Sequence, residues 1–200
     1  MKYDKITKNL LIESNEEFYK KNNVNNWLGT PWEGYIQLGA KQKGVLGEKI
    51  TETVLGEYGH EVKPPLDTGH DRIVDGLKTE IKFGLAISST KKDGKKIDPD
   101  NFMFNHIAVG KNWEIFVFFG VNPEKTNKNT RKTNDDYPQY RIYTMAKKDF
   151  KEHLNKRNTY PFKKQQGGKK QDNDDYIIAG KKACEALFKL SFVKEYKGVL

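Results

Sequence analysis

The chain has almost no cysteine and no long apolar run. Cys184 is the one cysteine among 200 residues, which excludes an internal disulfide and any multi-cysteine zinc site. Its neighbours, Ala183, Ala186 and Leu187, predict a thiol in the core rather than a nucleophile. The longest apolar run, Ile115 to Phe119, has the length of a buried strand and is too short to span a membrane.

Targeting signals and repeats are also missing. The N-terminus, MKYDKITKNL, lacks the apolar segment of a signal peptide. Together with the scarcity of cysteine, this predicts a cytoplasmic protein. The four histidines lack the spacing of metal ligands, and no internal repeat is visible. The length of 200 residues predicts one domain over residues 1–200 with a substantial core.

Charge is what the chain has in excess. Its 36 lysines and arginines outnumber 27 aspartates and glutamates, which gives a net charge of +9 that comes almost entirely from lysine. Such an excess suits a polyanionic partner, because Lys and Arg contacts to phosphates release counterions. A solvated surface in a lysine-rich proteome would give the same count. Charge alone therefore leaves nucleic-acid binding and a plain basic surface open.

Hydrophobic spacing predicts the order of elements in the first two-thirds of the chain. Apolar residues from Val45 to Tyr58 recur at helical spacing, and Gly59 follows where a helix ends. Beyond residue 121 we expect polar loops at 122–139 and 156–175, a strand at 140–144 and helices at 147–155 and 176–193. Before that point the expected elements are a helix at 6–20, an aromatic loop at 27–35, the helix at 45–58, strands at 60–63, 71–74 and 78–83, a helix from Asp98 through Ile107, and a strand at 115–121.

The two strands joined by the Asp75-Gly76 turn carry a pattern with chemical meaning. Glu80 and Lys82 are two residues apart, so a strand sends both side chains to the same face. If Asp71 lies across from Glu80, two carboxylates meet beside an ammonium. Two hard oxygen ligands are what Mg²⁺ takes from a protein at a phosphate site. The pattern predicts a site for phosphate chemistry with Asp71, Glu80 and Lys82 as its catalytic residues.

The stretch GHDRIVDGLKTEIKFG, from Gly69 to Gly84, resembles the metal-binding hairpin of the PD-(D/E)xK nuclease superfamily. Asp71 matches the aspartate of the family, and Glu80-Ile81-Lys82 matches its ExK motif. The upstream stretch GVLGEKITETVLGEYGHEV is similar to the helix that precedes this hairpin. The resemblance covers about residues 41 to 121. It implies an αβββαβ core with a mixed central sheet flanked by helices, elaborated at residues 1–40 and 122–200.

The resemblance also implies a set of ligands. Asp71 and Glu80 would hold Mg²⁺, for which Mn²⁺ can substitute, with the backbone carbonyl of Ile81 as a further ligand. Glu48 on the preceding helix is an auxiliary carboxylate. Asp75 is an alternative to Asp71 as the first carboxylate, but its place beside Gly76 favours a role in forming the turn.

Residues outside the core suggest how a nucleic acid could be held. The loop at 156–175 is basic and contains glutamines that can contact bases while lysines contact phosphates. A solvated loop without function is equally compatible with its composition. Trp27, Trp32 and Tyr35 are expected in the core or at a dimer contact. The candidate DNA-binding residues are Lys156, Arg157, Lys163, Lys164, Gln165, Gln166, Lys169 and Lys170.

These features predict a restriction-type endonuclease that hydrolyses double-stranded DNA at a specific sequence. The resemblance further implies a homodimer, with a cognate DNA methyltransferase as a possible partner in the host. Three alternatives stay open. The first is a related nuclease such as a junction resolvase, homing endonuclease or repair nickase, and the second is a DNA-binding module without catalysis. The third is an RNA-binding protein, which only the net charge supports.

Overall fold

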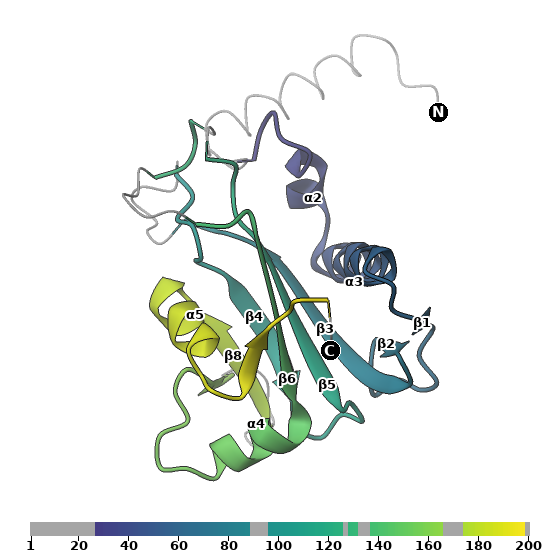
Figure 1. The fold of residues 1–200 in the computed structure, drawn as a ribbon. Coiled ribbons are helices and arrows are strands. Elements are labelled where there is room, and N and C mark those ends of the chain that lie inside the picture. The colour runs from purple at the N-terminus through teal and green to yellow at the C-terminus, as the bar shows by residue number, and fades with distance from the viewer. Residues whose placement is uncertain (1–26, 89–95, 126–127, 132–136, 166–173, 199–200) are drawn as a thin grey trace, which may run out of the picture.

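The computed structural model describes residues 27–88, 96–125, 128–131, 137–165 and 174–198. It has a mixed six-stranded sheet in the order β1-β2-β3-β5-β6-β9, a three-stranded sheet in the order β4-β8-β7, and helices packed around them (Figure 1). This confirms the α/β class with a mixed central sheet. The helices are α2 (Glu33–Gln37), α3 (Ala40–Glu57), α4 (Lys147–Leu154) and α5 (Lys181–Phe188). The helix expected at residues 6–20 lies outside the described residues.

Six strands follow α2 and α3 in succession, and three more lie between or after α4 and α5. Their bounds are β1 (Val62–Lys63), β2 (Arg72–Val74), β3 (Leu77–Leu85), β4 (Met103–Ala108), β5 (Ile115–Val121), β6 (Tyr140–Ala146), β7 (Lys163–Lys164), β8 (Asp175–Ala179) and β9 (Val193–Glu195). β3 pairs parallel with β5, whereas β1, β2, β6 and β9 are antiparallel to their neighbours. The strands predicted at 60–63, 71–74, 78–83, 115–121 and 140–144, and the helix at 147–155, are confirmed within a few residues.

Helix α3 ends as its sequence predicts. The His60 N–H bonds to the Leu55 carbonyl and the Gly59 N–H to the Gly56 carbonyl, at 3.1 and 2.9 Å. This pair of bonds requires a left-handed residue, and Gly59 adopts it with a φ of 91°. Gly47 lies where α3 packs on β3, and a Cβ added there would lie 2.5 Å from the Phe83 side chain. The glycine therefore lets α3 lie close against β3.

The segment predicted to be a helix from Asp98 through Ile107 is instead a turn followed by strand β4. Asp100 has a φ of 60°, which lies outside the right-handed helical region that residues within a helix adopt. Two hydrogen bonds from Arg141 and one from Asn122 hold its carboxylate. Phe102 and Phe104 are both fully buried, and their two-residue spacing suits a strand. His106, expected on that helix, lies on β4. The αβββαβ order is therefore wrong at its second helix.

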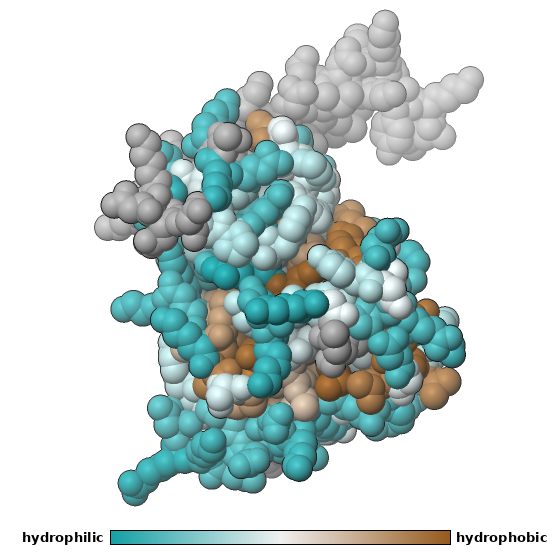
Figure 2. Space-filling model, in the orientation of Figure 1, coloured by the Kyte–Doolittle hydropathy of each residue, from teal (hydrophilic) through white to brown (hydrophobic). Residues whose placement is uncertain are grey.

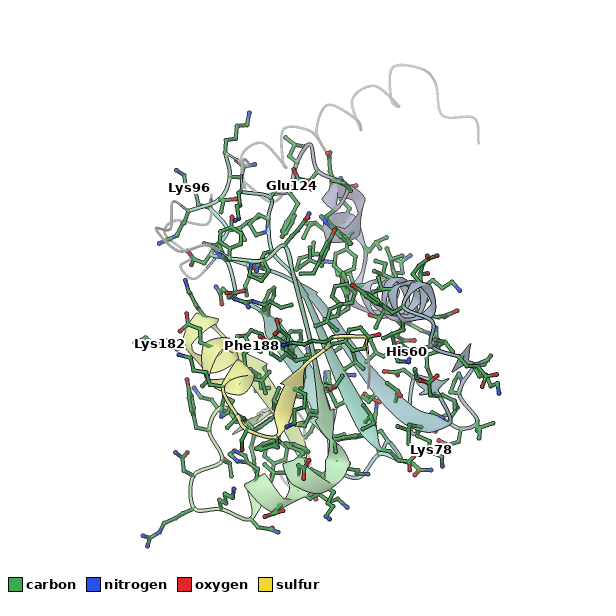
Figure 3. All side chains as sticks on the ribbon, in the orientation of Figure 1. His60, Lys78, Lys96, Glu124, Lys182 and Phe188 are labelled. Carbon is green, nitrogen blue, oxygen red and sulfur yellow. The ribbon has the colours of Figure 1, made fainter. Side chains whose placement is uncertain are left out.

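The C-terminal region was predicted as one helix at 176–193, which is also wrong. Residues 175–179 form strand β8, and Gly180, with a φ of 94°, separates it from α5. Helix α5 turns Lys182 outward and Phe188 toward the sheet (Figure 3), where Phe188 stacks on Tyr143 with ring centroids 4.2 Å apart. Cys184 is fully buried on the inner side of the helix, as predicted, and burial raises the pKa of its thiol to about 12.

The core is rich in aromatic side chains. Trp113, Phe116, Phe118 and Phe150 are fully buried, and large aromatic rings contribute much of the apolar area that stabilises a fold. Of the three aromatic residues near the N-terminus, Trp27 is buried, and Trp32 and Tyr35 pack on Phe83. The surface around α4 and the segment after it is largely hydrophilic (Figure 2). No helix among the described residues is long and apolar enough to cross a membrane.

Candidate active site

The open end of the β2–β3 hairpin brings the two predicted carboxylates together. The ladder of paired residues in this hairpin ends at Arg72 and Thr79. The Asp71 N–H bonds to the Thr79 carbonyl at 3.0 Å, and the Ile81 N–H donates to Asp71 Oδ2 at 2.8 Å. Asp71 is thus held against the Thr79–Ile81 segment of β3 that contains Glu80. The charges of both carboxylates act on Lys111 and on Glu48, so Asp71 and Glu80 belong to one electrostatic cluster.

Glu80 is the centre of the cluster. Its side chain is fully buried, and its Oε1 accepts hydrogen bonds from Lys82 Nζ at 2.5 Å and Lys111 Nζ at 2.7 Å. Its Oε2 is buried without a hydrogen-bond partner among the described residues. A buried carboxylate is costly unless charges and hydrogen bonds compensate it. The two ammonium groups supply that compensation at one oxygen only, which leaves the second oxygen available for another ligand.

Lys111 is a member of this cluster that the sequence pattern did not reveal. It lies in the loop between β4 and β5, and the ammonium of Lys147 bonds to its backbone carbonyl. Burial alone would lower the pKa of Lys111, but the hydrogen bond to Glu80 and the charges of Glu80 and Asp71 outweigh it and raise the pKa above its usual value. Lys111 is therefore a stable cation beside both carboxylates.

Helix α3 adds Glu48 to the same electrostatic neighbourhood. Burial raises the pKa of Glu48, and the negative charge of Asp71 raises it further. Glu48 Oε2 accepts a hydrogen bond from Arg72 at 3.2 Å, and the same guanidinium bonds to Glu52 at 3.0 Å. The sequence placed Glu48 near the hairpin correctly, while the bridging role of Arg72 and Glu52 was not predicted.

Asp75 lies at the opposite end of the hairpin. Its φ of 49° and the φ of 83° at Gly76 form the tight turn. Its carboxylate bonds to the ring of His60 at 2.5 Å and to the Glu61 N–H at 2.9 Å. The hydrogen bond with His60 lowers the pKa of Asp75. This geometry supports the turn-forming role of Asp75 and leaves Asp71 as the carboxylate beside Glu80.

The cluster has the donor atoms that a hard divalent cation takes. Glu80 Oε2 is a buried oxygen without a partner among the described residues, and the Asp71 carboxylate acts on the same lysine, Lys111. Within the described residues, no group of three or more His, Cys, Asp or Glu side chains is arranged to hold a metal ion. A cation here would therefore rely on two carboxylates, with backbone, water or substrate oxygens completing its coordination, as Mg²⁺ often does.

An open pocket of about 780 Å³ adjoins the cluster. Lys111 belongs to its lining and points from there to Glu80. The loop before β2 and the loop before β5 meet at this pocket, and a Cβ on Gly69 would lie 2.7 Å from the Cβ of Asn112. This close approach brings the segment that leads to Asp71 against the loop of Lys111. The pocket is lined by residues 67–69, Ala108, residues 110–112, Asp174 and Asp175.

The predicted DNA-binding residues fall in two groups. Lys156 and Arg157 are exposed just after α4, and Lys163 and Lys164 are exposed on β7. Gln165 follows β7 and is partly buried. Gln166, Lys169 and Lys170 lie outside the described residues. The geometry joins Gln165 to the pocket, because its backbone N–H bonds to the carbonyl of Asp175 at 2.9 Å.

Comparisons with known proteins give little beyond the fold described above. No protein-family model matches the chain, and no curated protein sequence is significantly similar to it. Among solved structures, the chain is similar to a bacterial homing endonuclease, I-Ssp6803I, at 15% sequence identity, covering 66% of this chain and 83% of that chain with a TM-score of 0.35. A similarity of this size does not establish a family or a function for this chain.

Proposed function

We propose that this chain is a metal-dependent DNA endonuclease whose active site is formed by Asp71, Glu80, Lys82 and Lys111. The observation that carries the proposal is the buried Glu80, with two ammonium groups on one oxygen and no partner among the described residues on the other, and with the charge of Asp71 acting on the same lysine, Lys111. A buried, incompletely satisfied carboxylate is unfavourable for stability, and such groups are typical of catalytic sites.

In this proposal Asp71 and Glu80 hold Mg²⁺, with Ile81 offering its backbone carbonyl and Glu48 acting as an auxiliary carboxylate. The bound ion would polarise the phosphoryl oxygen and lower the pKa of a water molecule. Lys82 orients the attacking water and stabilises charge that develops on the phosphate. Lys111, which approaches Glu80 from the pocket side, contacts the phosphate of the bound strand.

The substrate is proposed to be double-stranded DNA. The net charge of +9 and the exposed lysines of β7 favour a polyanion, and Lys111 connects the open pocket to Glu80. Sequence-specific cleavage of the restriction type, by a homodimer with one site per strand, is the form we favour, with Mn²⁺ able to substitute for Mg²⁺. A host methyltransferase would then protect the same sequence.

The test is digestion of long unmodified DNA by the full chain with Mg²⁺, with EDTA as the control, followed by sequencing of the ends. The proposal expects cuts that share a sequence and vanish with EDTA or with Glu80→Gln. Unchanged cutting by Glu80→Gln would refute the site, and binding of DNA without cutting would favour a non-catalytic module. The same assay with four-way DNA junctions and with RNA as substrates distinguishes a restriction-type endonuclease from a junction resolvase and from an RNA-binding protein.

A further inference from the structure

His106 has a backbone conformation that ordinary strand residues avoid. Its φ is 56°, and the pairing of β4 with β8 shifts register between Phe104 and Ile107. A bulge of this kind redirects a side chain, and a left-handed non-glycine residue stores strain that often accompanies a functional role. The His106 side chain is 61% exposed, so burial in the core does not explain why it is held there.

Two side chains fix the orientation of His106. Gln165 Oε1 accepts a hydrogen bond from the His106 backbone N–H at 3.0 Å, and Asp175 Oδ2 lies 2.8 Å from His106 Nδ1. Because an ionised carboxylate only accepts, Nδ1 carries a proton, and in the neutral form of the ring Nε2 is an acceptor. The Gln165 amide nitrogen lies 3.5 Å from that Nε2, which makes a weak hydrogen bond. A stronger donor from a ligand can replace this bond at Nε2, while the Gln165 amide donates to the ligand.

This donor–acceptor pair lies close to the proposed active site through Asp175. Asp175 orients His106 and also lines the pocket from which Lys111 reaches Glu80. It pairs with Ala108, another residue of the pocket lining. Asp175 thus links His106 to the pocket lining, and Lys111 links the same lining to Glu80.

The surroundings also suit a nucleic-acid strand. Lys163 and Lys164 are exposed on β7 directly before Gln165 and pair with β8. Ammonium groups hold phosphates without reading sequence, whereas an adjacent donor and acceptor can match the edge of adenine, which offers one acceptor and one donor in the major groove. Lys163 and Lys164 could therefore hold the phosphates while His106 and Gln165 contact the edge of a base.

We propose that His106 and Gln165, held in place by Asp175, form a base-reading site that contacts an adenine edge of the DNA bound across the pocket. This inference rests on the proposed function, because the DNA it names is the substrate of that active site. An exposed ion pair that merely closes the end of the β4–β8–β7 sheet is the competing explanation.

The experiment selects binding sites from a randomised duplex pool with the full chain, in Ca²⁺ or EDTA, so that its readout does not depend on cleavage. Wild type is compared with His106→Gly, Gln165→Ala and the control Gln139→Ala. Gln139 is exposed directly before β6 and is not part of the pocket lining. Glycine at 106 accepts the positive φ, so the fold of that variant should be at least as stable as that of wild type.

We expect wild type and Gln139→Ala to enrich a sequence containing an adenine for which His106→Gly and Gln165→Ala lose roughly 10- to 100-fold preference, the range of one bidentate base contact. Enrichment of the same sequence by all four proteins would overturn the inference, as would enrichment of none by wild type. A lower melting temperature of His106→Gly with an unchanged sequence would indicate the sheet-closing role. Failure of cleavage alone would reject the proposed function and leave the binding result to stand separately.

Discussion

The two ends of the β2–β3 hairpin carry similar residues in opposite roles. At the closed end, Asp75 bonds to His60, whose other ring nitrogen lies 2.6 Å from the Tyr196 hydroxyl. Both ring nitrogens of His60 and both carboxylate oxygens of Asp75 have partners, and these bonds tie the turn to Tyr196, directly after β9. At the open end, Glu80 is buried with one oxygen unpartnered. The contrast teaches that satisfied polar groups stabilise a fold, whereas an unsatisfied buried group marks a place for a ligand.

The largest expected effect is that of Glu80→Gln at the open end. Loss of the charge removes a proposed metal ligand, so the rate of DNA cleavage should fall by at least about 10³-fold. Binding of duplex DNA, measured by fluorescence anisotropy, should stay within about fivefold of wild type, since phosphate contacts supply most of the affinity. A cleavage rate within tenfold of wild type would show that Glu80 is not catalytic, and the two ends of the hairpin would then not differ in function.

Substitutions of the two lysines at the open end, Lys82 and Lys111, should have the next largest effects on the cleavage rate. Lys82→Ala is expected to lower the cleavage rate by about 10²–10³-fold, because one contact to transition-state charge has this value. Lys111→Ala should lower it by about 10–100-fold, as supporting groups around a metal ligand do. Lys78→Ala is the matched control. Lys78 lies on β3, as Lys82 does, but its ammonium is 3.9 Å from the carboxylate of Asp67. Single-turnover rates measure all three, and equal losses in Lys78→Ala and Lys111→Ala would deny Lys111 a specific role.

Glu48→Gln tests the helix side of the open end. Burial and the charge of Asp71 raise the pKa of Glu48, so the ionised form is disfavoured in the folded state. The stability it contributes is present at low pH and is lost as the pH rises through its raised pKa. Glu48→Gln should therefore melt at a slightly higher temperature than wild type at pH 7, with cleavage reduced only severalfold. A lower melting temperature at pH 7 would show that the bond to Arg72 outweighs the burial.

The smallest effect on catalysis is expected from Asp75→Asn at the closed end. The hydrogen bond with His60 lowers the pKa of Asp75, so its stabilising effect is present above its unfolded pKa of about 4 and is lost as the pH falls through the lower folded value. Wild type should therefore lose more thermal stability than Asp75→Asn below about pH 4. Cleavage at neutral pH should stay within about threefold. If Asp75→Asn lost as much cleavage as Glu80→Gln, Asp75 and not Asp71 would be the first catalytic carboxylate.

Local patterns predicted the hairpin and its neighbours well. Alternation along residues 78–83, the Asp75-Gly76 turn and the Gly59 helix end each depend on a few adjacent residues, and all three are in the structure. The register that pairs β2 with β3 as far as Arg72 and Thr79 follows from the tight turn, because a two-residue loop fixes the pairing of its strands. The positions of Asp71, Glu80 and Lys82 could therefore be inferred, although their catalytic roles stay predictions.

Long-range pairing explains what the sequence did not predict. Asp98 and Pro99 are typical of a helix start, but β4 is a strand because β8, about seventy residues later, pairs with it. Lys111 joins the site only because β5 lies parallel to β3, which brings the loop before β5 to the end where Glu80 lies. The His106–Asp175–Gln165 group depends on the same distant pairings.

The most direct measurement of the central claim is a crystal structure of the full chain soaked with Mn²⁺, with an anomalous difference map at the manganese edge. The account predicts a peak about 2.0–2.3 Å from carboxylate oxygens of both Asp71 and Glu80, with the Lys111 ammonium moved away from Glu80. A peak bound by other residues, or no peak between these two carboxylates at saturating Mn²⁺, would contradict it.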